Sequence, residues 1–283
     1  MSLYHLGWKA TIATASDLIA KGGRPRAFLV SIGVRPDRRL SEVEELVKGV
    51  YDAAAHLAAW LAGGDTNAAE EEEWIDVAGV ALAQKPVGVA VDDCIEIYTT
   101  VGRYGLTGLA FDIYRRGLYE SIEDYPEAYK ATTLPEPRIQ FLELVERVGN
   151  ECIRWASDVS DGLIATLSRL SSLTGHPVCL EELPPVHPEV EEYARRMRLD
   201  VASLVLNGGE EYEIVFGVKR ACITEIEKEA YRLGLRVARI GRAGAQCCSS
   251  DTSTGVINAR VRLYLKTRLA SAYTRWDQLR GWS

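Results

Sequence analysis

The sequence lacks any apolar run of the about 20 residues that a membrane-spanning helix needs. Its first residues, MSLYHLGWKAT, also lack the charged segment and apolar core that mark a secretory signal. The 283 residues carry a net charge of −7, and this acidic balance disfavours sequence-independent binding to nucleic acid, which needs a basic surface. We therefore expect a cytoplasmic protein that binds neither membranes nor nucleic acid.

The six cysteines include no C-x-x-C pair and do not show the cysteine and histidine spacing of a zinc site. Four of them stand singly in apolar segments, and the other two are adjacent, near a loop rich in glycine and serine. Such positions are typical of small, buried, unreactive side chains. We therefore expect reduced thiols and a reducing compartment.

Three common phosphate-binding patterns are absent: G-x-x-x-x-G-K-[ST], G-x-G-x-x-G at the start of a helix, and the protein-kinase motif set. If the protein uses a nucleotide, it binds the phosphates in another way. Mg²⁺ held by carboxylates would suit an acidic chain, because this ion is bound by carboxylate and phosphate oxygens together.

Helical and extended periodicities alternate along the chain and predict an α/β (α+β) architecture. Pro135 and Pro137 lie in a segment typical of a connection, so we predict an N-terminal domain over residues 1–134 and a C-terminal domain over 135–283. Helices are expected over 8–20, 41–61, 105–116, 138–148, 162–173, 189–197 and 223–233, and strands over 27–34, 74–82, 94–100, 152–159, 178–183, 213–218, 236–240 and 256–265.

Acidic residues recur where these elements end. Asp17 lies in a helix of Ala, Ile and Leu, where a buried carboxylate needs a partner or a metal; alternatively, it faces solvent or caps a neighbouring helix. Asp158 and Asp161 stand at a strand-to-helix junction, which suits Mg²⁺ or, alternatively, an N-cap pair. In Gly63-Gly64-Asp65-Thr66 the glycines allow a ligand to approach the backbone, although the string is also typical of a turn.

These strings, in their order, resemble thiamine-monophosphate kinases, a family of the aminoimidazole ribonucleotide synthetase superfamily. The matching strings are Gly7-Trp8-Lys9-Ala10, Ser16-Asp17-Leu18-Ile19-Ala20, Gly63-Gly64-Asp65-Thr66, Asp158-Val159-Ser160-Asp161-Gly162-Leu163 and Gly208-Gly209-Glu210-Glu211-Tyr212-Glu213. The resemblance implies a two-domain synthetase-like fold with an N-terminal domain that dimerises through its sheet. It also implies transfer of the ATP γ-phosphoryl group to thiamine monophosphate, which gives thiamine diphosphate.

The resemblance further implies a site in which metal ligands, and no separate catalytic residue, stabilise the charge on the transferred phosphoryl group. It implies that Asp17, Asp65, Asp158 and Asp161 bind Mg²⁺, that Tyr51, Gly64, Asp65 and Ser160 contact ATP, and that Glu211 and Trp276 contact the thiamine substrate.

The sequence departs from the family pattern in two places. The family carries two acidic strings, Asp-Asp-Ala-Ala and Thr-Asp-Met, before the Gly-Trp-Lys helix, and this sequence starts after them. We expect them to be truncated from a longer protein, supplied by a partner or lost. Lys85 or Pro86 stands where the family has an ATP-contacting arginine. A non-catalytic nucleotide-binding homologue and a sibling kinase with another small acceptor therefore stand beside the thiamine-monophosphate kinase as alternatives.

Overall fold

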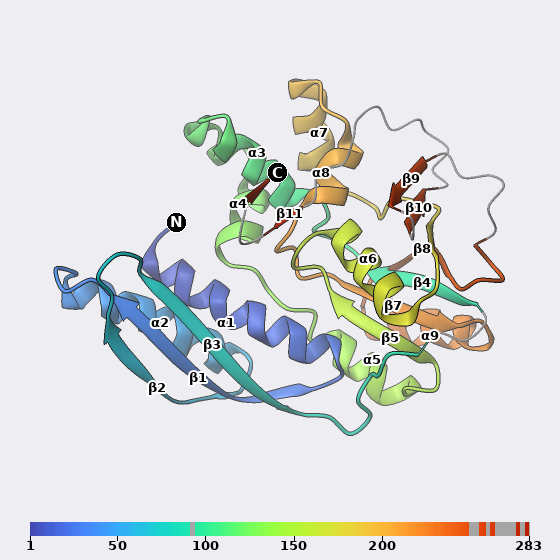
Figure 1. Ribbon diagram of the computed structural model, residues 1–283, viewed down its shortest axis with the longest axis horizontal. Helices are drawn as coiled ribbons and strands as arrows, with labels where there is room; N and C mark the ends of the chain where they lie inside the picture. Colours follow the sequence, from blue (N-terminus) through green and yellow to red (C-terminus); the bar gives the residue numbers. More distant parts are fainter. Residues whose placement is uncertain (91–93, 249–254, 259–260, 264–275, 278–280, 283) are drawn as a thin grey trace.

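The structure is a computed structural model that describes residues 1–90, 94–248, 255–258, 261–263, 276–277 and 281–282; after Cys248 it describes only the backbone of short strands. Two layers of helices and sheet lie side by side (Figure 1), which confirms the predicted α/β class. In the described part of the chain, no helix is both long and apolar enough to cross a membrane.

Each predicted helix and strand has a counterpart in the predicted order, and the strand expected over 256–265 is two short strands. The described residues also form elements that were not predicted, at Trp60–Ala68, Pro126–Thr133, Val201–Asn207, Trp276–Asp277 and Gly281–Trp282. The helices are α1 (Leu3–Ala20), α2 (Leu40–His56), α3 (Leu106–Arg115), α4 (Pro126–Thr133), α5 (Gln140–Val148), α6 (Leu163–Thr174), α7 (Pro188–Met197), α8 (Val201–Asn207) and α9 (Ile223–Arg232), with short 3₁₀ turns at Tyr119–Asp124 and Arg220–Cys222. The strands are β1 (Arg24–Val34), β2 (Trp60–Ala68), β3 (Trp74–Leu82), β4 (Ile95–Thr100), β5 (Ile153–Asp158), β6 (Val178–Leu180), β7 (Ile214–Lys219), β8 (Val237–Ala243), β9 (Gly255–Asn258), β10 (Val261–Leu263), β11 (Trp276–Asp277) and β12 (Gly281–Trp282).

The first layer is a three-stranded sheet in the order β2-β1-β3, in which β1 runs parallel to β2 and antiparallel to β3. Helices α1 and α2 cover one face of this sheet (Figure 1). Val30 and Ile32 of β1 pack there with Leu46 and Val50 of α2. The helical residues are four apart, so they fall on one face of α2, and this spacing places the helix against the sheet.

Strand β2 was not predicted. We expected residues 63–67 to form a glycine-rich turn, but they lie within β2, paired with β1. A Cβ atom at Gly64 would come within 1.9 Å of the carbonyl oxygen of Val30, so only glycine fits this close approach between the strands. Gly64 therefore allows β2 and β1 to pair closely. This contact joins residues distant in the sequence, so the local pattern could not distinguish it from a turn.

The second layer is a seven-stranded sheet in the order β5-β7-β4-β8-β6-β10-β9. Strand β4 lies between β7 and β8 and is antiparallel to both. Because β4 precedes residue 134, the predicted domain boundary does not coincide with the change of sheet, which falls between Leu82 and Ile95. The proline segment instead lies within the second layer, between α4 and α5.

The two layers share one hydrophobic core. Ile12 of α1 and Phe28 of β1 belong to the same buried cluster as Phe141 of α5 and Phe216 of β7. Full burial of such a side chain contributes about 1.5–3 kcal/mol. The contact between the layers is therefore part of what stabilises the fold, and it fixes α1 against the edge of the second sheet.

All six cysteines are paired, so the expectation of reduced thiols was wrong. The disulfides are Cys94–Cys247, Cys152–Cys222 and Cys179–Cys248, with sequence separations of 153, 70 and 69 residues. Partners so far apart leave no local spacing pattern, and only the packing of the second layer brings their Cα atoms to 5.5–5.8 Å.

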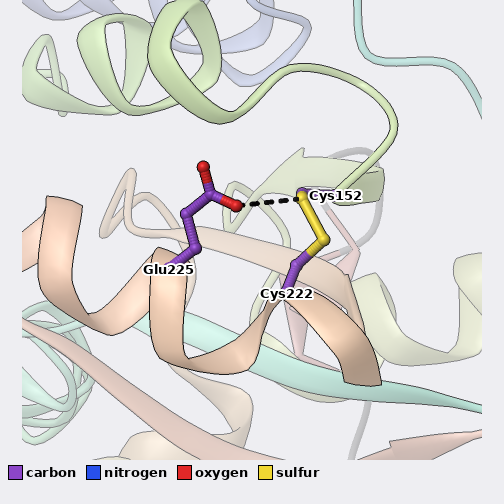
Figure 2. Close-up of side chains that lie close together, drawn as sticks. All are labelled: Cys152, Cys222 and Glu225. Carbon is purple, nitrogen blue, oxygen red and sulfur yellow. Dashed lines mark hydrogen bonds between the residues drawn. A yellow bond between two sulfur atoms is a disulfide. The ribbon is translucent and has the colours of Figure 1, made fainter.

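One of these disulfides lies beside a carboxylate. Figure 2 shows Glu225 of α9 pointing toward the Cys152–Cys222 bond, with its Oε2 atom 4.0 Å from the Cys152 sulfur. These three side chains gather their potential ligand atoms within 4.8 Å. Since a metal is bound by the thiolate and not by a disulfide, the bonded pair leaves a single carboxylate there. The disulfide therefore links the residue just before β5 to the 3₁₀ turn just before α9.

Candidate functional site

Two loops meet where β5 ends. Residues 159–162 connect β5 to α6, and residues 208–213 connect α8 to β7. The backbone N–H of Glu210 donates to the carbonyl oxygen of Ser160 at 2.6 Å, which holds the loops together. Gly162 has a φ of +92°, and a Cβ atom there would lie 2.9 Å from a carbonyl oxygen of the second loop. The glycine in the D-V-S-D-G string thus allows the loops to interlock.

The second loop is held in an unusual backbone conformation. Glu210 and Tyr212 have φ values of +62° and +50°, a region that non-glycine residues rarely occupy. Tyr212 N–H donates to the carbonyl oxygen of Val159, and the Glu210 carboxylate pairs with Lys9 Nζ at 2.5 Å. Because Lys9 belongs to α1, this ion pair ties the first layer to the loops of the second. Backbone strain of this kind is concentrated at functional sites.

Asp158 is the most unusual residue of the site. It ends β5 with 1% of its surface exposed, and neither carboxylate oxygen has a hydrogen-bond partner among the described residues. Burial, and then the charge of Asp17 on α1, raise the pKa of Asp158 to about 7. A buried carboxylate next to another acid is unfavourable unless a cation compensates it. Carboxylate oxygens are the ligands that Mg²⁺ prefers, so Asp17 and Asp158 fit this ion.

Two cationic side chains lie near the acidic pair. Lys21, at the end of α1, donates from Nζ to the carbonyl oxygen of Ala156, and burial lowers its pKa. Arg169, on α6, pairs with Asp161 through Nη2 and Oδ2 at 2.8 Å. The lysine is thus held against the backbone of β5, whereas the arginine reaches toward the loop that carries Asp161.

Of these groups, Asp17, Asp161 and Arg169 border a hollow of about 450 Å³ between the two layers. This size lies within the range of small-molecule sites. Its lining combines α1, β3, the loop after β5 and α6, so neither layer forms it alone. The lining residues are Ala13, Thr14, Asp17, Leu18, Val77, Ser160, Asp161, Arg169 and Tyr212.

Glu211 directly precedes Tyr212, which lines the hollow, but the side chain of Glu211 is buried and does not line it. It has 1% of its surface exposed, and its Oε1 atom accepts a hydrogen bond from the backbone N–H of Gly105 at 2.5 Å, at the start of α3. Its Oε2 atom has no partner within the described part of the chain. Burial raises the pKa of Glu211 well above its ordinary value. If Glu211 contacts the thiamine substrate, as the family resemblance implies, the substrate must therefore reach the start of α3.

The structure brings four predicted site residues together and leaves others apart. Asp17, Asp158, Ser160 and Asp161 gather at the hollow or directly beside it. The remaining predicted residues lie elsewhere or outside the described side chains: Tyr51 is exposed on α2, Gly64 and Asp65 are exposed on β2, and Trp276 begins β11, with its side chain outside what the structure describes.

Asp65 makes only local contacts within the described residues. Its carboxylate accepts from the backbone N–H of Thr66 at 2.9 Å and from the Asn67 amide at 3.0 Å. In the register of the sheet it stands beside Ser31 of β1. Its role as a metal ligand therefore stays a prediction.

Sequence reasoning missed both cations. Lys21 lies four residues after Asp17, a spacing that places two side chains on the same face of a helix. Arg169 lies eight residues after Asp161, about two turns along a helix. These spacings could have identified both residues, whereas the position of Arg169 at a hollow between two layers could not be foreseen.

The fold and this site define a class of protein. The model of the AIR synthase related protein N-terminal domain matches residues 1–84, which cover the first layer. A crystal structure of tt0281 from Thermus thermophilus has a TM-score of 0.80 and 33% sequence identity and covers 93% of this chain and 79% of its own. The chain is therefore a synthetase-like protein with the site between its two layers.

Comparison with curated relatives identifies the family of this chain within that class. The thiamine-monophosphate kinase of Pyrobaculum calidifontis is 34% identical over 219 residues, which are 77% of this chain and 69% of the relative. The chain belongs to the thiamine-monophosphate kinase family. A crystal structure described as AaThiL complexed with AMPPCP and TMP has a TM-score of 0.75 and 24% identity, with coverage of 86% and 75%.

Proposed function

We propose that the protein is an ATP- and Mg²⁺-dependent kinase that phosphorylates thiamine monophosphate to thiamine diphosphate. The observation that carries the proposal is the buried carboxylate of Asp158, which has no hydrogen-bond partner among the described residues and lies beside Asp17. A structural role would not need a buried acid without a hydrogen-bond partner at this position. Family membership supports the acceptor, because the curated relative bears that name.

In the proposed reaction, the bond between the γ-phosphorus and the bridging oxygen of ATP breaks. A new bond forms between that phosphorus and a phosphate oxygen of thiamine monophosphate. Asp17, Asp158 and Asp161 would hold Mg²⁺, which neutralises negative charge on phosphoryl oxygens. Ser160 would donate to a phosphate oxygen of ATP, and the interlocked loops would keep these groups in place. Catalysis of this kind depends on positioning and electrostatics, without a separate proton-transferring residue.

The test is to incubate the purified chain with ATP, MgCl₂ and thiamine monophosphate and to separate the thiamine phosphates by chromatography. We expect thiamine diphosphate to form in step with ADP. Binding of a non-hydrolysable ATP analogue without any product would support the non-catalytic homologue instead. ADP release with another small phosphorylated or amine acceptor, and none with thiamine monophosphate, would support the sibling kinase.

We further propose that the chain forms a homodimer through the uncovered face of the first sheet. Leu29, Val80 and Leu82 are 52%, 61% and 64% exposed on β1 and β3. An apolar patch of this kind on a sheet face, next to the exposed edge strand β2, is typical of an interaction surface. The register also places Asp65 on β2 beside this face, so a second chain would cover a predicted metal ligand.

A Val80→Glu variant is expected to reduce the mass in solution from two chains to one, because a charge would be buried at the centre of the interface. Light scattering coupled to size exclusion measures this mass. Leu40→Glu is the matched control, because Leu40 is 73% exposed at the start of α2 on the helical side of the layer. A monomeric parent chain, or a dimeric Val80→Glu variant, would refute this interface.

A further inference from the structure

Arg169 lies at the site of the proposed function but has no role in it so far. Its side chain comes from α6, borders the same hollow as Asp17 and Ser160, and is 47% exposed. One of its N–H groups donates to Asp161 at 2.8 Å. A guanidinium carries five N–H donors in a fixed planar arrangement, so several donors are left for a ligand in the hollow.

The other cation of the site is placed differently. Lys21 is an exposed residue like Arg169, but its ammonium donates to the carbonyl oxygen of Ala156 on β5. This hydrogen bond directs the lysine to the backbone beneath the acidic pair. Arg169 instead lies at the rim of the hollow, on the wall formed by α6, where a ligand can reach it. The two cations are therefore held by different partners, and only Arg169 is among the residues that line the hollow.

We propose that Arg169 binds the phosphate chain of the nucleotide, an inference that rests on the proposed function. The hollow is lined by Asp17 and Asp161, with Asp158 beside it, and it would repel an anion unless cations stood on both sides of the phosphates. The acids would hold Mg²⁺ on one side, and the guanidinium of Arg169 contacts phosphoryl oxygens on the other. Asp161 keeps the guanidinium oriented toward the hollow before the nucleotide arrives. Arginine suits this task because its planar donors match two oxygens of one phosphate.

The test measures affinity without turnover. Binding of adenosine 5′-(β,γ-imido)triphosphate with MgCl₂ is compared with binding of adenosine, for the parent chain and for Arg169→Gln, by calorimetry. We expect the variant to bind the triphosphate about 10-fold to 100-fold more weakly, the range for losing a hydrogen bond to a charged group. Binding of adenosine should not change. Arg169→Lys should recover part of the affinity, because it keeps the charge but loses the planar arrangement.

Arg195→Gln is the matched control, because Arg195 is exposed on α7, outside the residues that line the hollow. It removes the same charge from the chain and should leave both affinities unchanged. Circular dichroism and the midpoint of thermal unfolding show that each variant is folded. Equal triphosphate affinity of Arg169→Gln and the parent would overturn the inference. The inference would also be overturned if Arg169→Gln changed only the MgCl₂ concentration needed for binding and not the affinity for the triphosphate at saturating MgCl₂. Arg169 would then act only through Asp161.

The outcomes separate this inference from the proposed function. If the parent forms no thiamine diphosphate but Arg169→Gln weakens triphosphate binding, the inference holds and the kinase assignment fails. If the parent phosphorylates thiamine monophosphate and the variant binds the triphosphate normally, the assignment holds and the inference fails. A parent chain that does not bind the triphosphate overturns the inference, whatever the acceptor assay shows.

Discussion

An Asp158→Asn variant is expected to lose phosphoryl transfer by roughly 10²- to 10³-fold and yet to unfold at a higher temperature than the parent chain in the absence of Mg²⁺. The loss of activity follows from removing a proposed metal ligand, since stabilisation of transition-state charge by a metal is worth several kcal/mol. The gain in stability follows from the burial of Asp158, whose oxygens have no hydrogen-bond partner among the described residues.

The pH dependence of this stability gain has a definite sign. The pKa of Asp158 is raised from an ordinary 3.8 to about 7 in the folded protein. The folded state therefore holds a proton that the unfolded state releases, and the free energy of unfolding of the parent falls as the pH rises from about 4 through 7. The full effect is on the order of a few kcal/mol. Asparagine does not titrate, so the variant escapes this loss, and its advantage should be larger at pH 8 than at pH 5.

Thermal unfolding with and without MgCl₂, at pH 5 and pH 8, checks both halves of the prediction. At pH 8, Mg²⁺ should raise the unfolding temperature of the parent more than that of Asp158→Asn, because the variant lacks one of the three proposed carboxylate ligands. Asp124→Asn is the control, because Asp124 is 59% exposed at its side chain and pairs only at the surface with Arg196. Full activity of Asp158→Asn, or equal stabilisation by Mg²⁺, would contradict the metal assignment.

Reduction of the disulfides is expected to lower the unfolding temperature by roughly 10 °C or more. The three bonds close segments of 153, 70 and 69 residues, and cross-links over such lengths remove much of the conformational freedom of the unfolded chain. The chain-entropy argument gives about 4–5 kcal/mol for a single loop of this size, while typical measured values are about 2–4 kcal/mol. The three closed segments overlap in the sequence, so the contributions of the three disulfides to the free energy of unfolding do not simply add.

Unfolding scans with and without a phosphine reductant measure the change, and intact-mass analysis confirms the redox state. Alkylation of the denatured chain should add no groups before reduction and six after it, one for each cysteine. A Cys152→Ser, Cys222→Ser double variant should lose part of the stability and should respond less to the reductant. Six alkylated cysteines without reduction would show that the thiols are free, as their spacing had suggested.

Local signals in the sequence were enough for most helices and strands. The four-residue spacing of Leu46 and Val50 and the alternation along β3 follow from the periods of a helix and a strand, so they can be read without the fold. The strings around Asp17 and Asp158 were sufficient to indicate the family. Strand β2 was missed because Gly64 is needed for its close approach to β1. The residue that it approaches, Val30, is distant in the sequence.

Patterns in the sequence were enough to predict most of the elements, the family and the acidic residues that could bind Mg²⁺. Three features became visible only in the folded chain: Asp17 and Asp158 meet across two layers, Arg169 lines the same hollow as Asp17, and all six cysteines are paired. The difference lies in the range of the interactions. Periodicity and turn preference act between neighbours in the chain, whereas the pKa of Asp158 and the disulfides depend on groups brought together by the shared core around Ile12 and Phe216.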